Sequence, residues 1–281
     1  MSPEERRFEI SQLLRSRRDA LPPEGAGATT DGRRRVRGLR REEVAKLAGV
    51  SPSWYTWLEQ GREVHPSIRT LERIANALRL SEDESAYLRL LAGHRQDPIP
   101  PCITSYHTEA AIPGILDSFK VVPAVLYNRR FDVVAANSPA RLLYGQDIDS
   151  GSPWERNALW RFFMDPKRRR LYPDESADGG IRNMIQVLRI NWAMSDQSDG
   201  IGELIEELRK CSDFDIAWRE RKVATLATVS GRIRPCNWSE AIPVHYARLA
   251  VHGDGQHVIE ALIPAGCKAA SSLERYSITV T

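Results

Sequence analysis

Apolar positions recur every three or four residues through the first third of this 281-residue chain, which is the spacing of amphipathic helices. A first segment with this pattern runs from Glu4 to about Ala20. Ser67 and Ser81 are placed to cap two later segments, and Glu84 completes a capping box with Ser81. With two shorter helices between them, the pattern predicts five helices in about ninety residues, enough for a small all-helical domain with its own core.

Residues 42–61 predict two short helices joined by a tight turn. Gly49 stands where the first helix must end, and glycine adopts a positive φ there at little steric cost. Ser51 is suited to cap the second helix and is followed by a proline, which needs no N–H at the first helical position. Helical spacing puts Tyr55 and Leu58 on the inward face of that helix. An ordinary antiparallel helix pair with a glycine turn would show the same features.

The same segment carries the pattern E-x-x-A-x-x-A-G-V-S, followed by a helix that ends L-E-x-G. The matching residues are Glu42, Ala45, Ala48, Gly49, Val50, Ser51, Leu58, Glu59 and Gly61. This pattern resembles the lambda-repressor-like, Xre/Cro-type helix-turn-helix family, in which the second helix enters the major groove of DNA. The resemblance implies base contacts from Ser53, Thr56, Trp57 and Gln60. It also implies that Glu59 braces the fold against an arginine of the first helix, such as Arg18.

Positive charge is concentrated in this part of the chain. Residues 1–95 contain 18 Lys and Arg against 14 Asp and Glu, whereas the remainder contains 22 against 23. Six arginines fall within nine residues at 33–41. Such a run is often a solvated loop, but beside a helix-turn-helix we expect it to follow DNA phosphates, which hold and orient a protein without reading sequence. The predicted DNA contacts outside the second helix are Arg33, Arg34, Arg35, Arg37, Arg40, Arg41, Ser51, Arg62 and Arg69.

A proline-rich segment predicts a linker at 95–112, followed by a second domain at 113–270 and a tail at 271–281. The second domain mixes two periodicities. Strands are predicted at 121–128, 131–137, 223–229, 242–251 and 257–263, and helices at 138–145, 157–165, 181–194 and 201–221. Glycines at 252–256 suit a hairpin turn between the last two strands. This order predicts an α+β domain whose helices cover a sheet face.

Three stretches of the chain resemble the MmyB-like regulators. They are R-R-F-D-V-V-A-A-N-S-P-A at 129–140, N-A-L-W-R-F-F-M-D-P at 157–166 with Leu171-Tyr172-Pro173-Asp174, and the upstream G-L-R-R-E-E-V-A-K-L-A-G-V-S. The resemblance implies two domains: an all-α, five-helix, lambda-repressor-like DNA-binding domain at 1–94, and an α+β, PAS-like domain thought to bind a fatty-acid-like ligand. It therefore implies a transcription regulator that reads DNA and senses a small apolar molecule.

Large apolar residues on the predicted helices of the second domain favour either a ligand pocket or ordinary core packing. By spacing alone, core packing is the simpler interpretation. Trp160, Phe163 and Trp192 are the candidates for a pocket wall. Arg189 and Asn137 are the candidates for holding a carboxylate, although a surface arginine and a turn-capping asparagine are the more ordinary interpretations.

Other function classes find little support in the sequence. There is no apolar run long enough for a membrane span and no signal-peptide pattern. The four cysteines form no C-x-x-C pair and the histidines show no metal-binding spacing, so we expect no metal and no cofactor beyond a possible bound fatty acid. Motifs of catalysis are missing as well. We expect a cytoplasmic, nucleoid-associated, non-enzymatic regulator that binds double-stranded DNA as a homodimer. In the alternative hypothesis, the second domain docks another protein and holds no small molecule.

Overall fold

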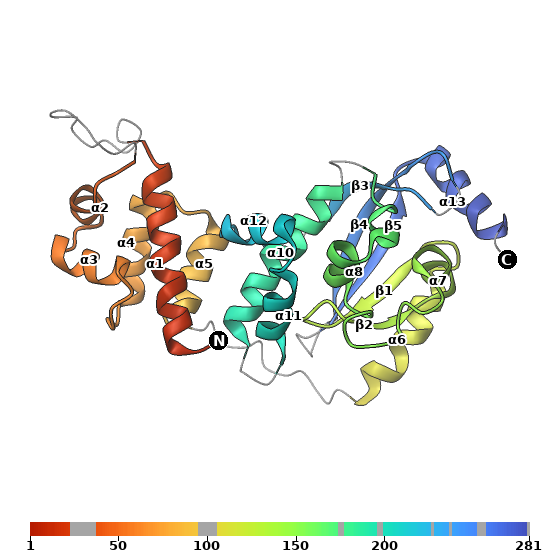
Figure 1. Ribbon diagram of the computed structural model, residues 1–281, viewed down its shortest axis with the longest axis horizontal. Helices are drawn as coiled ribbons and strands as arrows, with labels where there is room; N and C mark the ends of the chain where they lie inside the picture. Colours follow the sequence, from red (N-terminus) through yellow and green to blue (C-terminus); the bar gives the residue numbers. More distant parts are fainter. Residues whose placement is uncertain are drawn as a thin grey trace. The chain divides into compact units, whose positions relative to one another are not determined.

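Among the residues that the structure describes, the N-terminal domain of the computed structural model contains five helices, as the apolar pattern predicted (Figure 1). They are α1 (Pro3–Ala20), α2 (Arg41–Ala48), α3 (Pro52–Glu59), α4 (Ile68–Ala77) and α5 (Glu82–Leu91). The capping box predicted at α5 is present. Ser81 Oγ accepts a hydrogen bond from the Glu84 N–H at 3.2 Å, and Glu84 Oε2 accepts one from the Ser81 N–H at 2.9 Å. A cap of this kind contributes about 1 kcal/mol to helix stability.

The structure describes residues 1–22, 38–94, 106–173, 177–195, 199–225, 228–235, 238–251 and 257–279. Four arginines predicted to contact DNA, Arg33, Arg34, Arg35 and Arg37, lie outside these ranges. The hairpin turn predicted at 252–256 lies outside them too, as do residues 95–105 of the predicted linker. The rest of that linker belongs to helix α6 (Tyr106–Ser118).

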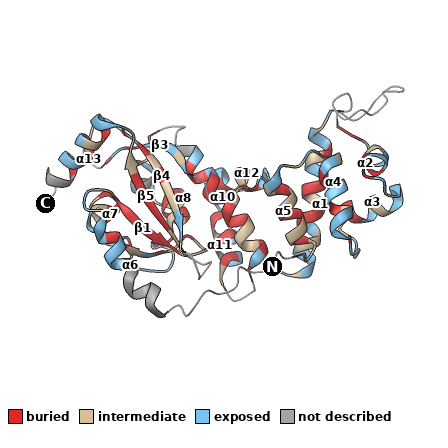
Figure 2. Cartoon of the chain, turned by 180° about the vertical axis from the view of Figure 1, so that it is seen from behind, coloured by how far each residue is buried: buried red, intermediate tan, exposed pale blue. Residues whose placement is uncertain are grey.

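Apolar side chains from all five helices of the N-terminal domain are buried, and buried residues are coloured red on the cartoon of Figure 2. They include Leu13, Leu14, Val44, Tyr55, Leu58, Leu71, Ile74, Leu88 and Leu91. Tyr55 and Leu58 are 0% and 2% exposed, which confirms the predicted inward face of α3. Burying such a side chain stabilises the fold by roughly 1.5–3 kcal/mol. Helix α3 is therefore held along one side and leaves its other side in solvent.

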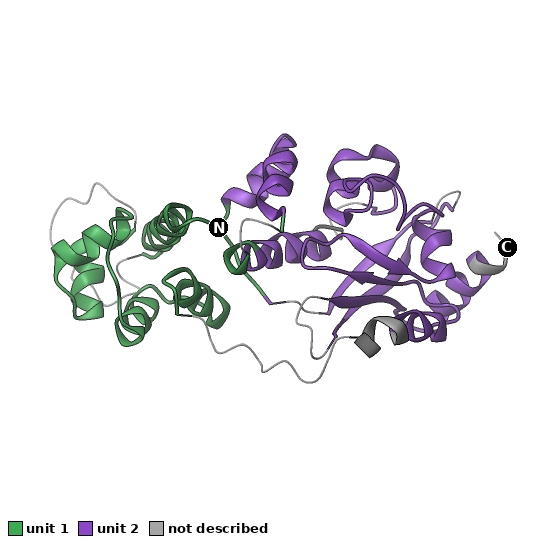
Figure 3. Ribbon diagram, turned by 90° about the horizontal axis from the view of Figure 1, so that it is seen from below, with its two compact units in different colours: residues 1–96, 192–199, 220–224 green, residues 97–191, 200–219, 225–281 purple. Residues whose placement is uncertain are grey.

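The chain divides into two compact units, coloured differently in Figure 3, and the division does not follow sequence order strictly. One unit contains residues 1–96, 192–199 and 220–224, and the other contains 97–191, 200–219 and 225–281. Within the first unit, the Met1 amino group donates to the Ser195 carbonyl at 3.2 Å, and Arg221 Nε lies 3.9 Å from Glu9 Oε1. Met1, just before α1, and Glu9 of α1 thus contact two short segments from late in the sequence, which the sequence pattern did not predict.

The second domain is an α+β fold built on one five-stranded antiparallel sheet. Its strands are β1 (Ala124–Tyr127), β2 (Val133–Ala136), β3 (Val229–Ile233), β4 (Ile242–Ala250) and β5 (Val258–Pro264). The helices after α6 are α7 (Ser138–Tyr144), α8 (Ala158–Met164), α9 (Pro166–Arg169), α10 (Ala177–Met194), α11 (Ile201–Leu208), α12 (Ser212–Arg219) and α13 (Cys267–Thr279). The strand order is β2-β1-β5-β4-β3. The predicted two-domain, all-α then α+β fold class is confirmed, and the sheet is consistent with the PAS-like expectation.

Alternation along β1 sorts its side chains between the two faces of the sheet. Ala124 and Leu126 pack with Leu116 of α6 and Ile259 of β5 in one hydrophobic cluster. Tyr127 has the opposite orientation and lines a cavity together with residues of α8. The sheet therefore separates a closed apolar layer beneath α6 from a cavity on its other face.

One predicted strand is misplaced. The apolar run at 223–229 reads as a strand, but β3 begins only at Val229. Val223 is 7% exposed and belongs to the segment 220–224 of the first unit. Val223 is therefore buried as a residue of the first unit and not as a residue of the sheet. The apolar pattern alone does not distinguish these two kinds of burial.

Two other segments differ from the prediction. The single helix predicted at 201–221 is divided into α11 and α12, because a serine and acidic residues at 212–215 provide the signals that start a new helix. The predicted tail at 271–281 falls largely inside α13, which packs against β4 and β5. The Tyr276 hydroxyl donates to the Leu142 carbonyl at 3.0 Å, so this segment is part of the fold.

Cys211 and Cys267 are free thiols, and the other two cysteines lie outside the described ranges. Among the helices that the structure describes, none is both long and apolar enough to cross a membrane.

Candidate DNA-binding surface and ligand cavity

A glycine turn sets the geometry of α2 and α3. Gly49 has φ 63° and ψ 39°, in the left-handed region. Its N–H donates to the Lys46 carbonyl at 3.2 Å, and the Val50 N–H donates to the Ala45 carbonyl at 2.9 Å, which together form a Schellman motif. Ser51 Oγ then accepts a hydrogen bond from the Trp54 N–H at 3.2 Å. The end of α2 and the start of α3 are therefore both specified within three residues.

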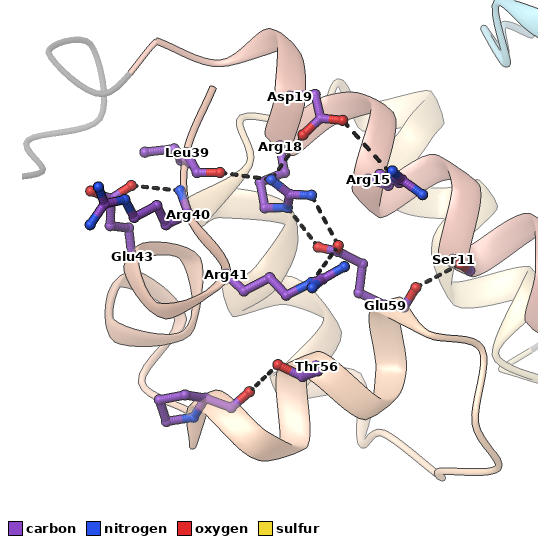
Figure 4. A network of polar contacts seen from close by, with 11 residues as sticks. Ser11, Arg15, Arg18, Asp19, Leu39, Arg40, Arg41, Glu43, Thr56 and Glu59 are labelled. Atoms are coloured by element: carbon purple, nitrogen blue, oxygen red, sulfur yellow. Dashed lines mark hydrogen bonds and ion pairs between the residues drawn. The ribbon is translucent and has the colours of Figure 1, made fainter. Parts of the chain in front are cut away.

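Glu59, the last residue of α3, anchors this helix in the domain (Figure 4). Its side chain is buried and accepts from Arg18 Nε at 2.7 Å, from Arg18 Nη2 at 3.0 Å and from Arg41 Nε at 2.8 Å. Arg18 Nη1 also donates to the Leu39 carbonyl at 2.8 Å. The predicted pairing of Glu59 with Arg18 is confirmed. Two arginines of different helices thus hold one carboxylate and fix the C-terminal end of α3.

The electrostatics of this anchor favour the charged form of the carboxylate. Burial acts to raise the pKa of Glu59, but the hydrogen bonds and charges of Arg18 and Arg41 outweigh it and lower that pKa below its ordinary value. For Arg18, burial acts to lower the pKa, and the partnership with Glu59 raises it overall. Both partners therefore stay ionised at neutral pH, and the bidentate geometry adds strength to the pair.

Two residues predicted to touch DNA have a structural role. Arg41 uses its Nε to hold Glu59, although its side chain is still 42% exposed. The Thr56 hydroxyl donates to the Pro52 carbonyl at 2.7 Å, a bond back to the preceding turn of its own helix. Thr56 is also half-buried. Its hydroxyl proton is thus engaged within α3, and the base contact expected of Thr56 stays a prediction.

The other predicted positions that the structure describes lie at the surface. Ser53, Trp57 and Gln60 are exposed along the outer side of α3, with Trp57 at 44%. The side chains of Arg40, Arg62 and Arg69 are exposed as well, and so is Ser51, whose hydroxyl oxygen caps α3. Ser53, Trp57 and Gln60 therefore lie on the outward side of α3, as the sequence predicted, whereas Thr56 is half-buried.

Two of the small cavities formed by the described residues of the second domain lie between the sheet and its helices. One, of about 30 Å³, is lined by Tyr127, Val133, Tyr144, Ile148, Ala158, Arg161, Phe162, Arg168, Leu171 and Tyr172. The other, of about 20 Å³, is lined by Tyr127, Ala158, Tyr172, Gly180, Ile181, Met184, Tyr246, Arg248 and Glu260. Tyr127, Ala158 and Tyr172 border both, so the two cavities are neighbours divided by shared side chains.

Tyrosine hydroxyls and an ion pair supply the polar groups of the second cavity. Arg248 Nε donates to Glu260 Oε2 at 2.7 Å across the β4–β5 ladder, and Arg248 also donates to Asn183 of α10. Burial raises the pKa of Tyr127 and of Tyr246, and the negative charge of Glu260 raises both further. These hydroxyls therefore stay protonated and can donate hydrogen bonds.

The first cavity contains a buried cation that the sequence analysis missed. Arg161 of α8 donates to the backbone carbonyls of Glu155, of Asp147 at 3.0 Å and of Tyr144 at 3.5 Å. Burial lowers the pKa of Arg161, and the nearby charge of Arg168 lowers it further. The Asp147 carboxylate lies 3.9 Å away on a side chain that is 68% exposed. A lone arginine within the apolar run N-A-L-W-R-F-F was the signal available in the sequence.

None of the five predicted ligand residues lines either cavity. Asn137 is 1% exposed. Its Oδ1 accepts from two backbone N–H groups, of Ala124 and Ala140, each at 3.0 Å. Its Nδ2 donates to the carbonyls of Leu116, Phe119 and Val122. The side chain joins α6, β1 and α7 and has no capacity left for a ligand.

The other four candidates also have packing roles. The Arg189 guanidinium stacks 3.8 Å from the ring centroid of Trp218 and donates to the Trp218 carbonyl. Phe163 packs edge-on against Phe214, with ring centroids 5.4 Å apart. Trp160 and Trp192 are half-buried, and residue 192 belongs to the first compact unit. Core packing, the simpler interpretation of the aromatic pattern, therefore accounts for Arg189 and Phe163.

Among the described residues, no group of three or more His, Cys, Asp and Glu is placed to hold a metal ion. The helix-turn-helix and the cavity-bearing α+β fold together define a DNA-binding transcription regulator with a ligand-binding domain. Family models agree with this class: residues 9–88 match a helix-turn-helix domain, and residues 109–275 match the MmyB-like transcription regulator ligand binding domain. The chain belongs to the MmyB-like transcription regulators. Both matched families are regulatory and not enzymatic. No match was found among curated proteins.

Proposed function

We propose that this protein is a cytoplasmic, nucleoid-associated regulator that reads double-stranded DNA as a homodimer and responds to a small fatty-acid-like molecule. The observation that carries the proposal is the two-sided character of α3. One side is fixed by the buried Glu59 and its arginines, and the other presents Ser53, Trp57 and Gln60 to solvent.

The DNA-reading part follows from groove chemistry. The major groove admits one α-helix, and side chains on its outer side reach base edges. Gln60 has the amide group that pairs with adenine in two hydrogen bonds. The exposed Arg40, Arg62 and Arg69 would hold phosphates around it. A dimer of such domains reads two half-sites about one helical turn apart, roughly 10 base pairs.

The ligand part follows from the lining of the first cavity. Its apolar wall includes Val133, Ile148 and Leu171. Arg161 and Arg168 lie on one side of the cavity, since both approach the Asp147 carboxylate, at 3.9 Å and 3.1 Å. Positive charge beside an apolar wall suits an acid with an apolar tail. Ligand pockets usually measure about 300–1,000 Å³, so the shared side chains must move apart when such a molecule enters.

The proposal is tested on the full chain in two ways. Selection from a random duplex pool should enrich a palindromic site, and replacing Ser53 and Gln60 together by alanine should remove the enrichment while circular dichroism stays unchanged. Each lost base contact should cost about 1–3 kcal/mol of discrimination. Failure to enrich any sequence would refute the DNA-reading part.

Native mass spectrometry of the purified chain, followed by calorimetric titration with decanoate, tests the ligand part. A co-purified or titrated acid bound one per chain supports it. An empty domain that ignores decanoate but retains one partner protein supports the alternative, in which the second domain is a protein-interaction module.

A further inference from the structure

The exposed side of α3 has a tryptophan between two polar residues. Ser53, Trp57 and Gln60 are spaced i, i+4 and i+7, which places them in one row along the helix. Trp57 is the middle member and is 44% exposed. Tyr55, two residues earlier on the same helix, is 0% exposed. Helix α3 is therefore firmly packed, and its orientation directs the indole ring of Trp57 towards solvent.

The hydrogen-bonding capacity of this row lies at its two ends. Thr56, the neighbour of Trp57, has its hydroxyl proton committed to the Pro52 carbonyl. Ser53 and Gln60 provide the polar groups that remain. Between them the helix offers the exposed, apolar ring surface of Trp57.

The major groove offers one kind of apolar group. Each base pair presents hydrogen-bond donors and acceptors there, and only thymine adds a methyl group, on C5. On the basis of the proposed DNA-reading function, we propose that Trp57 is a specificity-determining residue that packs its indole ring on the C5 methyl group of a thymine in each half-site. Gln60 and Ser53 then read the neighbouring base pairs.

Uracil replacement tests this assignment because it removes the methyl group and keeps every hydrogen-bonding atom of thymine. A site is first enriched from a random 30-base-pair pool with the full chain, and is then resynthesised with deoxyuridine at one thymine position at a time. We expect one thymine per half-site at which the replacement weakens binding about four-fold, the worth of one buried methyl group. Replacement in both half-sites should weaken binding roughly fifteen-fold if the two contributions add.

Variants connect the effect to Trp57. Trp57→Ala should bind thymine and uracil sites equally, whereas Trp57→Phe, which keeps an aromatic ring, should keep part of the difference. Leu47→Ala is the matched control, because Leu47 is also apolar and 42% exposed, on α2; it should keep the whole difference. Unchanged thermal unfolding of Trp57→Ala would exclude a folding defect.

Two negative outcomes are distinguishable. If no sequence is enriched, the DNA-reading function fails and the Trp57 assignment fails with it. If a site is enriched but deoxyuridine has no effect at any position, or the effect persists in Trp57→Ala, the assignment to Trp57 is wrong while the DNA-reading function stands.

Discussion

The two domains each contain a buried charged side chain, but the charges are compensated differently. In the DNA-binding domain, Glu59 is held by two arginines within hydrogen-bond distance. In the ligand-binding domain, Arg161 donates to neutral backbone carbonyls, and the carboxylate of Asp147, 3.9 Å away, is on an exposed side chain. A charge with buried partners of opposite sign fixes a fold. A buried cation that has no buried carboxylate partner favours the binding of an anionic ligand beside it.

The largest effect should come from breaking the compensated site. Glu59→Ala removes the buried carboxylate partner of Arg18, and breaking a buried pair typically costs about 3–5 kcal/mol. Urea denaturation of the full chain should show this loss in the transition that includes the DNA-binding domain. Glu63→Ala is the control, because Glu63 is exposed just after α3, and it should change stability by less than about 0.5 kcal/mol. If both variants lowered the free energy of unfolding equally, Glu59 would stabilise the domain no more than an exposed glutamate does.

The second-largest effect should be a loss of affinity for an acidic ligand in Arg161→Gln. The variant loses a charge-assisted hydrogen bond to the ligand carboxylate, worth about 1.5–3 kcal/mol, so decanoate affinity should fall at least ten-fold in calorimetric titration. Arg170→Gln removes the same charge from an exposed position that lines neither cavity. If both variants bind decanoate as the original chain does, Arg161 is not the ligand anchor.

The anchor should also give the stability of the DNA-binding domain a specific pH dependence. The pKa of Glu59 is lowered in the fold because, although burial opposes it, the two arginines stabilise the carboxylate. Its contribution is complete above the unfolded pKa and is lost as the pH falls through the folded pKa. The difference in unfolding free energy between the original chain and Glu59→Gln should therefore shrink from pH 6 to pH 3, by on the order of 1 kcal/mol. A difference that is constant with pH would contradict this.

The smallest effects should come from the exposed arginines near α3. Arg62→Gln and Arg69→Gln should weaken binding to selected and random DNA alike, because phosphate contacts do not read sequence. Each should reduce the slope of log K against log salt concentration by about 0.9. Fluorescence anisotropy over a salt series measures this, and a change in sequence preference would place either arginine at a base edge.

The sequence predicted the DNA-binding domain better than the ligand site, for a physical reason. The glycine turn, the Ser51 cap and the Glu59–Arg18 pair depend on local chemistry or a family pattern, and all three are present in the structure. The first cavity is assembled from β1, β2, α7, α8 and α9, so no single segment shows it. Helical spacing instead drew attention to aromatic residues that pack against one another, such as Phe163.

The same limit explains the misplaced strand and the Asn137 assignment. An apolar run at 223–229 carries no mark of which unit buries it, and Val223 is buried outside the sheet. Asn137 looked like a polar group available at a strand end. Its three carbonyl acceptors come from a segment 15 to 21 residues earlier in the chain, a distance at which sequence spacing gives no guidance.

The membership of residues 192–199 and 220–224 in the N-terminal unit bears on how such a regulator can be recombined. Consider a chimera that joins residues 1–95 of this chain to the second domain of another regulator. Its Met1 and Glu9 would lose the contacts that they make here with the Ser195 carbonyl and with Arg221. The DNA-binding domain therefore cannot be exchanged as residues 1–95 alone. A functional chimera must take residues 192–199 and 220–224 from the same parent protein as α1.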